Sequence, residues 1–267
     1  MKLTAIALVG AITFSVMSLP AAADSIPYNI TSDYQSLDDT SYGYGMGRDT
    51  DSAGRPYGAD SFNADYGSLG AYAIFEPGSG VVLTFDEGYE NGYTSIILDT
   101  LRGKNVKAIF FVTGDYVKDN KALVKRMIDE GHIIGNHGMK HKSIPGLSLE
   151  SLTEDIMSLH ELVKAEFDYD MMYFRPPCGE FSERSLAAVK DLGYTTLMWS
   201  FAYVDWEENN QPNADTAFER ITSASHEGEI MLLHAVSSVN ADLMPEIIDT
   251  FREKGLEFVL PVVKYVG

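Results

Sequence analysis

Two histidines are the residues of this chain whose type and spacing are best suited to binding a metal ion. His137 and His141 stand four positions apart, which on a helical turn places both imidazoles on one face. Such a pair is a common way to hold a first-row divalent ion. A zinc peptidase would need glutamate directly after the first histidine, and this chain has Gly138 there, which argues against a metallopeptidase. On the residues alone, two surface histidines remain the alternative.

Two adjacent carboxylates offer acid–base chemistry. Asp86 and Glu87 follow the apolar run at 81–85, and Gly88 after them allows a sharp turn. Because neighbouring residues of an extended chain point to opposite sides, the two carboxylates need not share a role. One could bind a metal while the other acts as a base, and an acidic loop is the alternative.

Three further polar residues follow other apolar runs. Arg175 precedes two prolines that fix the backbone, and a guanidinium held in this way is suited to orient a carboxylate. Asp205 follows the run at 195–199, and His234 follows the run at 230–233. A lone histidine there is more often a core residue than a catalyst, but its position matches that of the other polar residues.

Strands and helices alternate after residue 80, and these elements must position the polar residues. Apolar, β-branched runs predict strands at 81–85, 108–113, 132–135, 172–174, 195–199, 230–233 and 258–260. Helical periodicity predicts helices at 93–102, 121–130, 149–166, 182–192, 215–226 and 241–254. This alternation implies an α/β fold with a parallel sheet covered by helices. Such a sheet is either closed as a barrel or open and doubly wound. Because the polar residues follow several different strands, we expect the barrel, a distorted (β/α)7 barrel.

The N-terminal part of the chain indicates export. A basic start and an apolar run that ends in alanines before Asp24 predict a signal peptide at 1–23, with a membrane anchor as the alternative. Residues 24–79 lack sustained periodicity and predict an irregular N-terminal extension that lies against the main domain at 80–267. No later segment is long and apolar enough to cross a bilayer, so we expect a secreted or cell-envelope protein without an integral membrane segment after cleavage.

The charge of the chain excludes several partners. The 39 acidic residues outnumber the 20 basic ones and give a formal net charge of −19, which would repel nucleic acid and anionic lipid. No glycine-rich phosphate-binding sequence follows any expected strand, so nucleotide binding has no support. Cys178 is the single cysteine, which excludes an internal disulfide.

Five segments, in order, resemble the motifs of the polysaccharide deacetylase family, the NodB-homology domain of carbohydrate esterase family 4. They are Thr84-Phe-Asp-Glu-Gly88, His137-Gly-Met-Lys-His141, Arg175-Pro-Pro-Cys-Gly179, Asp205-Trp206 and Leu232-Leu-His234. The longer runs Thr-Phe-Asp-Glu-Gly-Tyr-Glu-Asn-Gly and Arg-Pro-Pro-Cys-Gly-Glu-Phe-Ser-Glu look most like the branch that deacetylates muramic acid. That branch contributes to muramic δ-lactam in the spore cortex during sporulation.

The resemblance implies metal-assisted hydrolysis of N-acetyl groups on a cell-wall glycan. Asp86 would be the general base, oriented by Arg175. His234 would be the general acid, kept charged by Asp205. A divalent ion of the Zn, Co or Mn class would be held by His137, His141 and Glu87. The sugar would contact Trp206, Cys178, Tyr89 and Asn91.

Three positions depart from the family pattern. Glu87 stands where the usual ligand is aspartate, and its longer side chain implies weaker metal binding. Gly138 replaces a serine or threonine whose hydroxyl could brace the loop. Cys178 occupies a position that is often tyrosine, or arginine in some muramic enzymes. A lactyl carboxylate would then need another cation, such as Lys140 or Lys142.

Other functions stay open at this point. Within the family, the alternative substrates are peptidoglycan N-acetylglucosamine, chitin oligosaccharide and acetylated xylan. From another class, the chain could be a non-catalytic protein that binds wall glycan with a degenerate metal site. Cys178 with a histidine could form a thiol nucleophile. Two histidines with a carboxylate also suit a non-haem iron oxygenase, although those enzymes usually adopt all-β folds.

Overall fold

A curled parallel sheet forms the centre of the molecule. The structure is a computed structural model that describes residues 34–261, and the predicted signal peptide at 1–23 lies outside the described residues. Seven strands follow the order β2-β8-β6-β5-β4-β3-β9, and every neighbouring pair is parallel. The strands are β2 (Ala71–Tyr72), β3 (Val82–Glu87), β4 (Ile109–Val112), β5 (Ile133–Asn136), β6 (Tyr173–Phe174), β8 (Thr195–Leu197) and β9 (Ile230–His234). The curled sheet forms a half-barrel that stays open between the edge strands β2 and β9. This arrangement confirms the predicted distorted (β/α)7 barrel.

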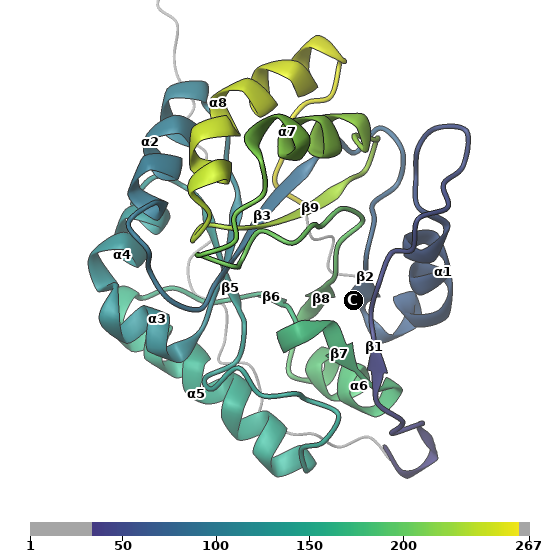
Figure 1. Cartoon of the computed structure of the whole chain (residues 1–267). Helices are drawn as coiled ribbons and strands as arrows, with labels where there is room; N and C mark the ends of the chain where they lie inside the picture. The colour runs from purple at the N-terminus through teal and green to yellow at the C-terminus, as the bar shows by residue number, and fades with distance from the viewer. Residues whose placement is uncertain (1–33, 262–267) are drawn as a thin grey trace, which may run out of the picture.

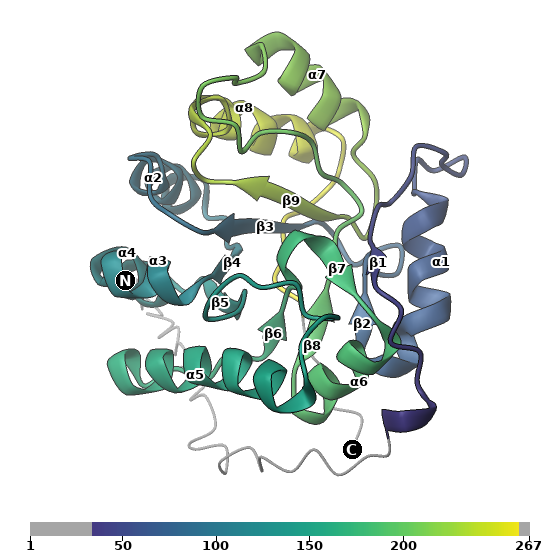
Figure 2. The same ribbon diagram turned by 60° about the horizontal axis from the view of Figure 1, so that its bottom comes forward.

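Helices cover the outside of the curled sheet (Figures 1 and 2). They are α2 (Thr94–Lys104), α3 (Gly114–Asp119), α4 (Lys121–Asp129), α5 (Leu149–Phe167), α6 (Glu183–Asp191), α7 (Ala214–Ser223) and α8 (Ser238–Glu253). Ser148 caps α5 and Ser182 caps α6, because each side chain accepts a hydrogen bond from the backbone N–H three residues later. Within residues 34–261, none of the helices combines the length and apolar character that a membrane crossing requires.

Side-chain alternation along β3 sorts its residues between two environments. Leu83 and Phe85 join the large core beneath the helices. Val82 belongs instead to the small inner core with Ile109 and Phe111 of the neighbouring strand β4. Because the period of a strand is two, Asp86 lies on the inner side with Val82, and Glu87 lies on the helix side with Phe85.

The seventh strand differs from the predicted one. Residues 258–260 are not a strand, and only an isolated parallel bridge joins Val81 to Phe258. The seventh place in the sheet is taken by β2, which pairs with β8 at the opposite edge. With only two residues, β2 carries no periodicity that a sequence pattern could detect.

The N-terminal extension is more ordered than its sequence suggests. From residue 34 onward it contains the 3₁₀ turns η1 (Tyr34–Ser36) and η2 (Gly67–Leu69), the helix α1 (Tyr57–Tyr66) and the strands β1 and β2. β1 (Tyr42–Gly43) pairs antiparallel with β7 (Glu180–Phe181), next to the turn η3 (Pro177–Gly179). Phe62 of α1 packs edge to face on Phe181, which closes a separate small core. The extension therefore packs as an integral layer of the described fold.

The extension also holds the loop that precedes β9. The buried Arg55 guanidinium donates to the carbonyls of Phe75 (3.0 Å) and Glu227 (2.7 Å) and pairs with Asp60 at 2.8 Å. The Phe75 N–H donates to the carbonyl of Gly228 at 2.8 Å. This close backbone approach leaves no room for a side chain at Gly228, where an added Cβ would lie 2.2 Å from the Phe75 oxygen.

We predict that Gly228→Ala destabilises the protein much more than Gly255→Ala. Both glycines have a positive φ, +74° and +81°, so alanine incurs a backbone cost of about 1–2 kcal/mol at either position. At Gly255 no atom lies within 4 Å of the added Cβ, whereas Gly228 faces the Phe75 carbonyl. Overpacking should add about 1–3 kcal/mol at Gly228. Urea unfolding measures both, and equal losses of stability would contradict the close approach.

Candidate active site

The carboxyl ends of the strands open into a cavity of about 570 Å³. Six of the residues singled out from the sequence line it: Asp86, His137, His141, Cys178, Trp206 and His234. An adjoining cavity of about 400 Å³ shares several of these residues and also reaches Tyr89 and Lys140. Asp86 and His234 are directly opposite each other on the paired strands β3 and β9. The structure thus brings together groups that are far apart along the chain.

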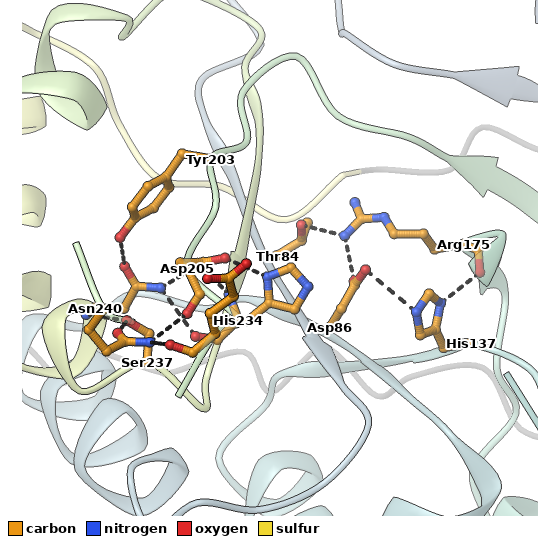
Figure 3. A network of polar contacts seen from close by, with 11 residues as sticks. Thr84, Asp86, His137, Arg175, Tyr203, Asp205, His234, Ser237 and Asn240 are labelled. Carbon is orange, nitrogen blue, oxygen red and sulfur yellow. Dashed lines mark hydrogen bonds and ion pairs between the residues drawn. The ribbon is translucent and has the colours of Figure 1, made fainter. Parts of the chain in front are cut away.

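Asp86 lies between a guanidinium and an imidazole (Figure 3). Arg175 Nη1 donates to its Oδ1 at 2.8 Å, and its Oδ2 lies 3.6 Å from His137 Nε2. Burial by itself would raise the pKa of Asp86, but the charges of Arg175, His137 and His234 together lower that pKa below its ordinary value. The carboxylate is therefore ionised near neutral pH and can accept a proton.

Arg175 is fully buried and every arm of its guanidinium is bonded. Nε donates to the carbonyl of Leu197 (2.9 Å), Nη2 to that of Met198 (2.9 Å), and Nη1 to Thr84 Oγ1 (2.8 Å) as well as to Asp86. The guanidinium carbon also lies 4.2 Å from the ring centroid of Phe111. These contacts leave the guanidinium a single position, so it fixes the Asp86 carboxylate in turn.

His137 is held in one tautomer. Its Nδ1 lies 2.8 Å from the backbone oxygen of Arg175, and because a carbonyl can only accept, Nδ1 carries the hydrogen. Burial lowers the pKa of His137 to about 4, so the ring is neutral and Nε2 offers a lone pair beside Asp86. The His141 ring lies 4.8 Å away, centroid to centroid. Two neighbouring imidazoles of this kind fit a divalent ion.

The loop between these histidines is braced by Asp155. Gly138 has a φ of +80°, and its N–H donates to Asn136 Oδ1 at 2.9 Å. Asp155 Oδ2 accepts from the Met139 N–H at 3.0 Å and lies 2.7 Å from where a Cβ of residue 138 would be. A carboxylate from α5 thus occupies the space that a serine or threonine side chain would need. Sequence reasoning missed this residue because it lies within α5, outside the motifs.

Glu87 is not brought together with the two histidines. Its side chain is fully buried on the helix side of β3, and neither carboxylate oxygen has a hydrogen-bond partner among the described residues. Burial, with the charges of Glu90 and Asp86, raises the pKa of Glu87 well above its ordinary value. Across residues 34–261, no three His, Cys, Asp or Glu side chains are grouped as a metal site. The alternation of the strand turns Glu87 away, so the expected three-residue ligand set is not assembled.

His234 is held by a second buried network (Figure 3). Its Nδ1 lies 2.7 Å from Asp205 Oδ1, and its backbone N–H donates to Asp205 Oδ2 at 2.8 Å. Asn240 Nδ2 donates to the same oxygen at 2.6 Å, and Tyr203 donates its hydroxyl hydrogen to Asn240. Burial alone would lower the pKa of His234, but the hydrogen bond and charge of Asp205, with the charge of Asp86, raise it. Sequence reasoning missed Tyr203 and Asn240, which lie outside the motifs.

The remaining predicted residues lie at different places. Trp206 is half exposed, and its ring centroid lies 5.4 Å from that of His234. Tyr89 is exposed at the adjoining cavity. Asn91 lines neither cavity and donates to the carbonyl of Val236 at 3.0 Å, so it holds a loop.

Cys178 does not have the properties of a nucleophile. It lines the larger cavity, but burial and the charge of Glu180 raise the pKa of its thiol. A catalytic cysteine needs the opposite shift, because the thiolate is the reactive form. The geometry therefore favours chemistry centred on Asp86 and His234.

Comparison with known proteins identifies related sequences. The polysaccharide deacetylase family model matches residues 76–197. Peptidoglycan-N-acetylmuramic acid deacetylase PdaA of Bacillus subtilis is 44% identical over 179 residues, which are 67% of this chain and 68% of PdaA. An uncharacterized 30.6 kDa protein of Geobacillus stearothermophilus is 42% identical over 205 residues, with 76% and 77% covered.

Solved structures define the class of fold. The structure of B. subtilis PdaA, a family 4 carbohydrate esterase, superposes with a TM-score of 0.79 at 37% identity and covers 83% of this chain and 95% of PdaA. A family 4 carbohydrate esterase from Bacillus anthracis gives 0.69 at 38% identity, with 84% and 95% covered. The fold is that of the family 4 carbohydrate esterases. The chain belongs to the polysaccharide deacetylase family and is a hydrolase that acts on carbon–nitrogen bonds other than peptide bonds.

Deacetylases of this family generally depend on a metal. We predict that His137→Ala weakens zinc binding to the purified protein, whereas Glu87→Gln leaves it unchanged, because only the histidine faces the cavity. Removing a residue that only orients a metal ligand lowers metal affinity by about 10- to 100-fold. Removing the His137 imidazole itself should therefore lower zinc affinity by at least about tenfold. Calorimetric titration of the metal-free variants measures this. A comparable loss in Glu87→Gln would show that Glu87 is a ligand.

Proposed function

We propose that this protein removes the acetyl group from N-acetylmuramic acid residues of peptidoglycan and releases acetate. The observation that carries the proposal is the pairing of Asp86 and His234 across β3 and β9 in one cavity, where the pKa of Asp86 is lowered and the pKa of His234 is raised. The similarity to PdaA, which is named for this activity, supports the choice of sugar.

Asp86 is the general base in this proposal. An amide carbonyl is a poor electrophile, so the attacking water must lose a proton as the new bond to carbon forms. Arg175 keeps Asp86 ionised and fixes its Oδ1, which leaves Oδ2 to accept that proton. Arg175 is a positioning residue, because its bonded arms touch protein groups.

His234 is the general acid. An amine leaves the tetrahedral intermediate readily only once its nitrogen is protonated, so the acid must hold a proton before the carbon–nitrogen bond breaks. Asp205 accepts from Nδ1 of His234, which leaves Nε2 as the donor toward the cavity. Asn240 and Tyr203 hold Asp205 in place, and their contribution is positional.

His137 and His141 would hold a divalent ion of the Zn, Co or Mn class, without Glu87. Such an ion would polarise the acetyl carbonyl and make the attacking water more acidic. With only two protein ligands, the affinity should be lower than in a site with three. Trp206 and Tyr89 would contact the sugar at the cavity mouth, since both are exposed there.

The substrate class fits the other expectations from the sequence. Peptidoglycan lies outside the cytoplasmic membrane, which agrees with the signal peptide predicted at 1–23 and with a secreted or envelope location. The muramic branch of the family links this activity to the spore cortex, so we expect a role in sporulation.

We predict that the purified wild-type protein releases acetate from peptidoglycan. Asp86→Asn and His234→Gln should each lower turnover by about 100-fold or more, which is the usual effect of removing a general acid or base. Mass spectrometry of the digested glycan should locate the lost acetyl group on muramic acid. Asp115→Asn is a matched control, because Asp115 lies at the adjoining cavity but pairs with Lys140. Loss of acetyl from N-acetylglucosamine alone would overturn the choice of sugar, and near-normal turnover of the two variants would overturn the roles.

We also predict that Asp205→Asn shifts the alkaline limb of the rate profile to lower pH. His234 works in its protonated form, so turnover falls as the pH rises through the pKa of His234. Asp205 raises this pKa, and its neutral replacement should lower it. The free energy of unfolding should depend on pH in the same direction. Charged His234 stabilises the folded protein at low pH, and this stabilisation is lost as the pH rises through the folded-state pKa of His234. Rate profiles and NMR titration of His234 measure the shift, with Asp215→Asn as an exposed control. An unmoved limb would contradict the assignment.

A further inference from the structure

Arg220 is a cation in the cavity that the proposed hydrolysis does not use. It belongs to α7, is exposed, and lines the 570 Å³ cavity together with Asp86 and His234. No carboxylate among residues 34–261 forms an ion pair with its guanidinium. Arg48 also has no such partner among the described residues, but it lines neither cavity. A carboxylate oxygen lies within 4.0 Å of the guanidinium nitrogens of the other arginines, Arg55, Arg102, Arg126, Arg175, Arg184 and Arg252. In a chain with 39 acidic residues, an arginine left without such a partner at a cavity wall is available to a ligand.

The side chain has firm support from the fold. Ala217 and Ile221, on either side of it along α7, are buried and fix the helix. The guanidinium carbon lies 6.0 Å from the ring centroid of Tyr203, and Tyr203 is itself buried and bonded to Asn240. A guanidinium over an aromatic face keeps its N–H groups free at the ring's edge. Arg220 can therefore donate two parallel hydrogen bonds to a ligand.

Within this cavity, Arg220 is the cationic group that the proposed hydrolysis leaves unassigned, because His137, His141 and His234 take part in the reaction. Much of its wall is apolar or aromatic, formed by Trp199, Ala202, Val204 and Leu232. His234 is bonded to Asp205, and Arg175 is bonded to Asp86. An anionic ligand would also meet the field of a chain with a net charge of −19. Arg220 would offset this unfavourable field for a negatively charged group that lies away from the reacting amide.

N-acetylmuramic acid has a carboxylate in the right part of the molecule. Its lactyl group is attached to the sugar carbon next to the one that bears the acetamide, so the carboxylate lies only a few bonds from the amide to be cleaved. N-acetylglucosamine has a hydroxyl at that carbon and no charge. A planar guanidinium matches a carboxylate with two parallel hydrogen bonds, which a hydroxyl cannot reproduce.

We propose that Arg220 determines the specificity of the cavity by binding the lactyl carboxylate of N-acetylmuramic acid. This inference rests on the function proposed above and assigns the selection of the sugar to one residue. It replaces the lysines considered from the sequence. Lys140 pairs with Asp115 at 3.3 Å and lines the adjoining cavity, and Lys142 lines neither cavity.

The test compares two ligands, a disaccharide containing N-acetylmuramic acid and its methyl ester, which is uncharged and carries one additional methyl group. Binding is measured by calorimetry in an Asp86→Asn background, which prevents turnover. With Arg220 present, the acid should bind about 10- to 100-fold more tightly than the ester, the range expected for hydrogen bonds to a charged group. Arg220→Gln should abolish the difference, and Arg220→Lys should restore part of it. Lys142→Gln is the matched control, since it removes an equal charge outside the cavity.

Kinetics separate this inference from the proposed function. With Asp86 intact, Arg220→Gln should raise KM for muramic substrates and leave kcat nearly unchanged. The wild-type protein could release acetate from muramic acid while Arg220→Gln still binds the free-acid disaccharide more tightly than the methyl ester. In that case the role of Arg220 is wrong and the proposed function stands. If the preference depends on Arg220 but the wild-type protein releases no acetate, the proposed function fails and the binding assignment stands.

Discussion

The buried guanidinium of Arg175 is the contact on which the rest of the site depends. Desolvating a guanidinium costs several kcal/mol unless its hydrogens are bonded, and here the surrounding strands supply those bonds. The side chain reaches Thr84 and Asp86 of β3 and the carbonyls of Leu197 and Met198 at β8. The backbone of Arg175 contributes as well, because its carbonyl fixes the tautomer of His137. One residue thus sets the charge of the base and the direction of an imidazole.

The two adjacent carboxylates show how strongly the strand period controls chemistry. Asp86 faces the inside of the barrel, where a cation lowers its pKa, and Glu87 faces the helices, where burial raises its pKa. One position along the chain therefore separates an ionised base from a carboxyl group without a bonding partner among the described residues. A family motif assigns both positions to the reaction, but the pleat of β3 makes only the first accessible from the cavity.

Much of the fold and part of the site could be predicted from the sequence, for a common reason. A strand rich in β-branched residues has a clear end, and Asp86 and His234 were found because they stand at such ends. The class of fold was predicted from the alternation of strands and helices, and the family from the motifs at the strand ends. Both predictions were confirmed. The two-residue β2 and the six-residue α3 lack the length for a periodic signal. Asn240, Tyr203 and Asp155 could not be recognised, because their importance comes from neighbours that only the folded chain provides.

The most direct test of the account is the coupling between Arg175 and Asp86, measured by the free energy of unfolding of Arg175→Met, Asp86→Asn and the double variant at neutral pH. Removing one partner of a buried pair leaves the other uncompensated, at a cost of about 3–5 kcal/mol. Removing both should therefore destabilise the protein by less than the sum of the single changes, with a coupling of at least about 2 kcal/mol. Single effects that add to within about 0.5 kcal/mol would show that the two side chains act independently, and would contradict the account.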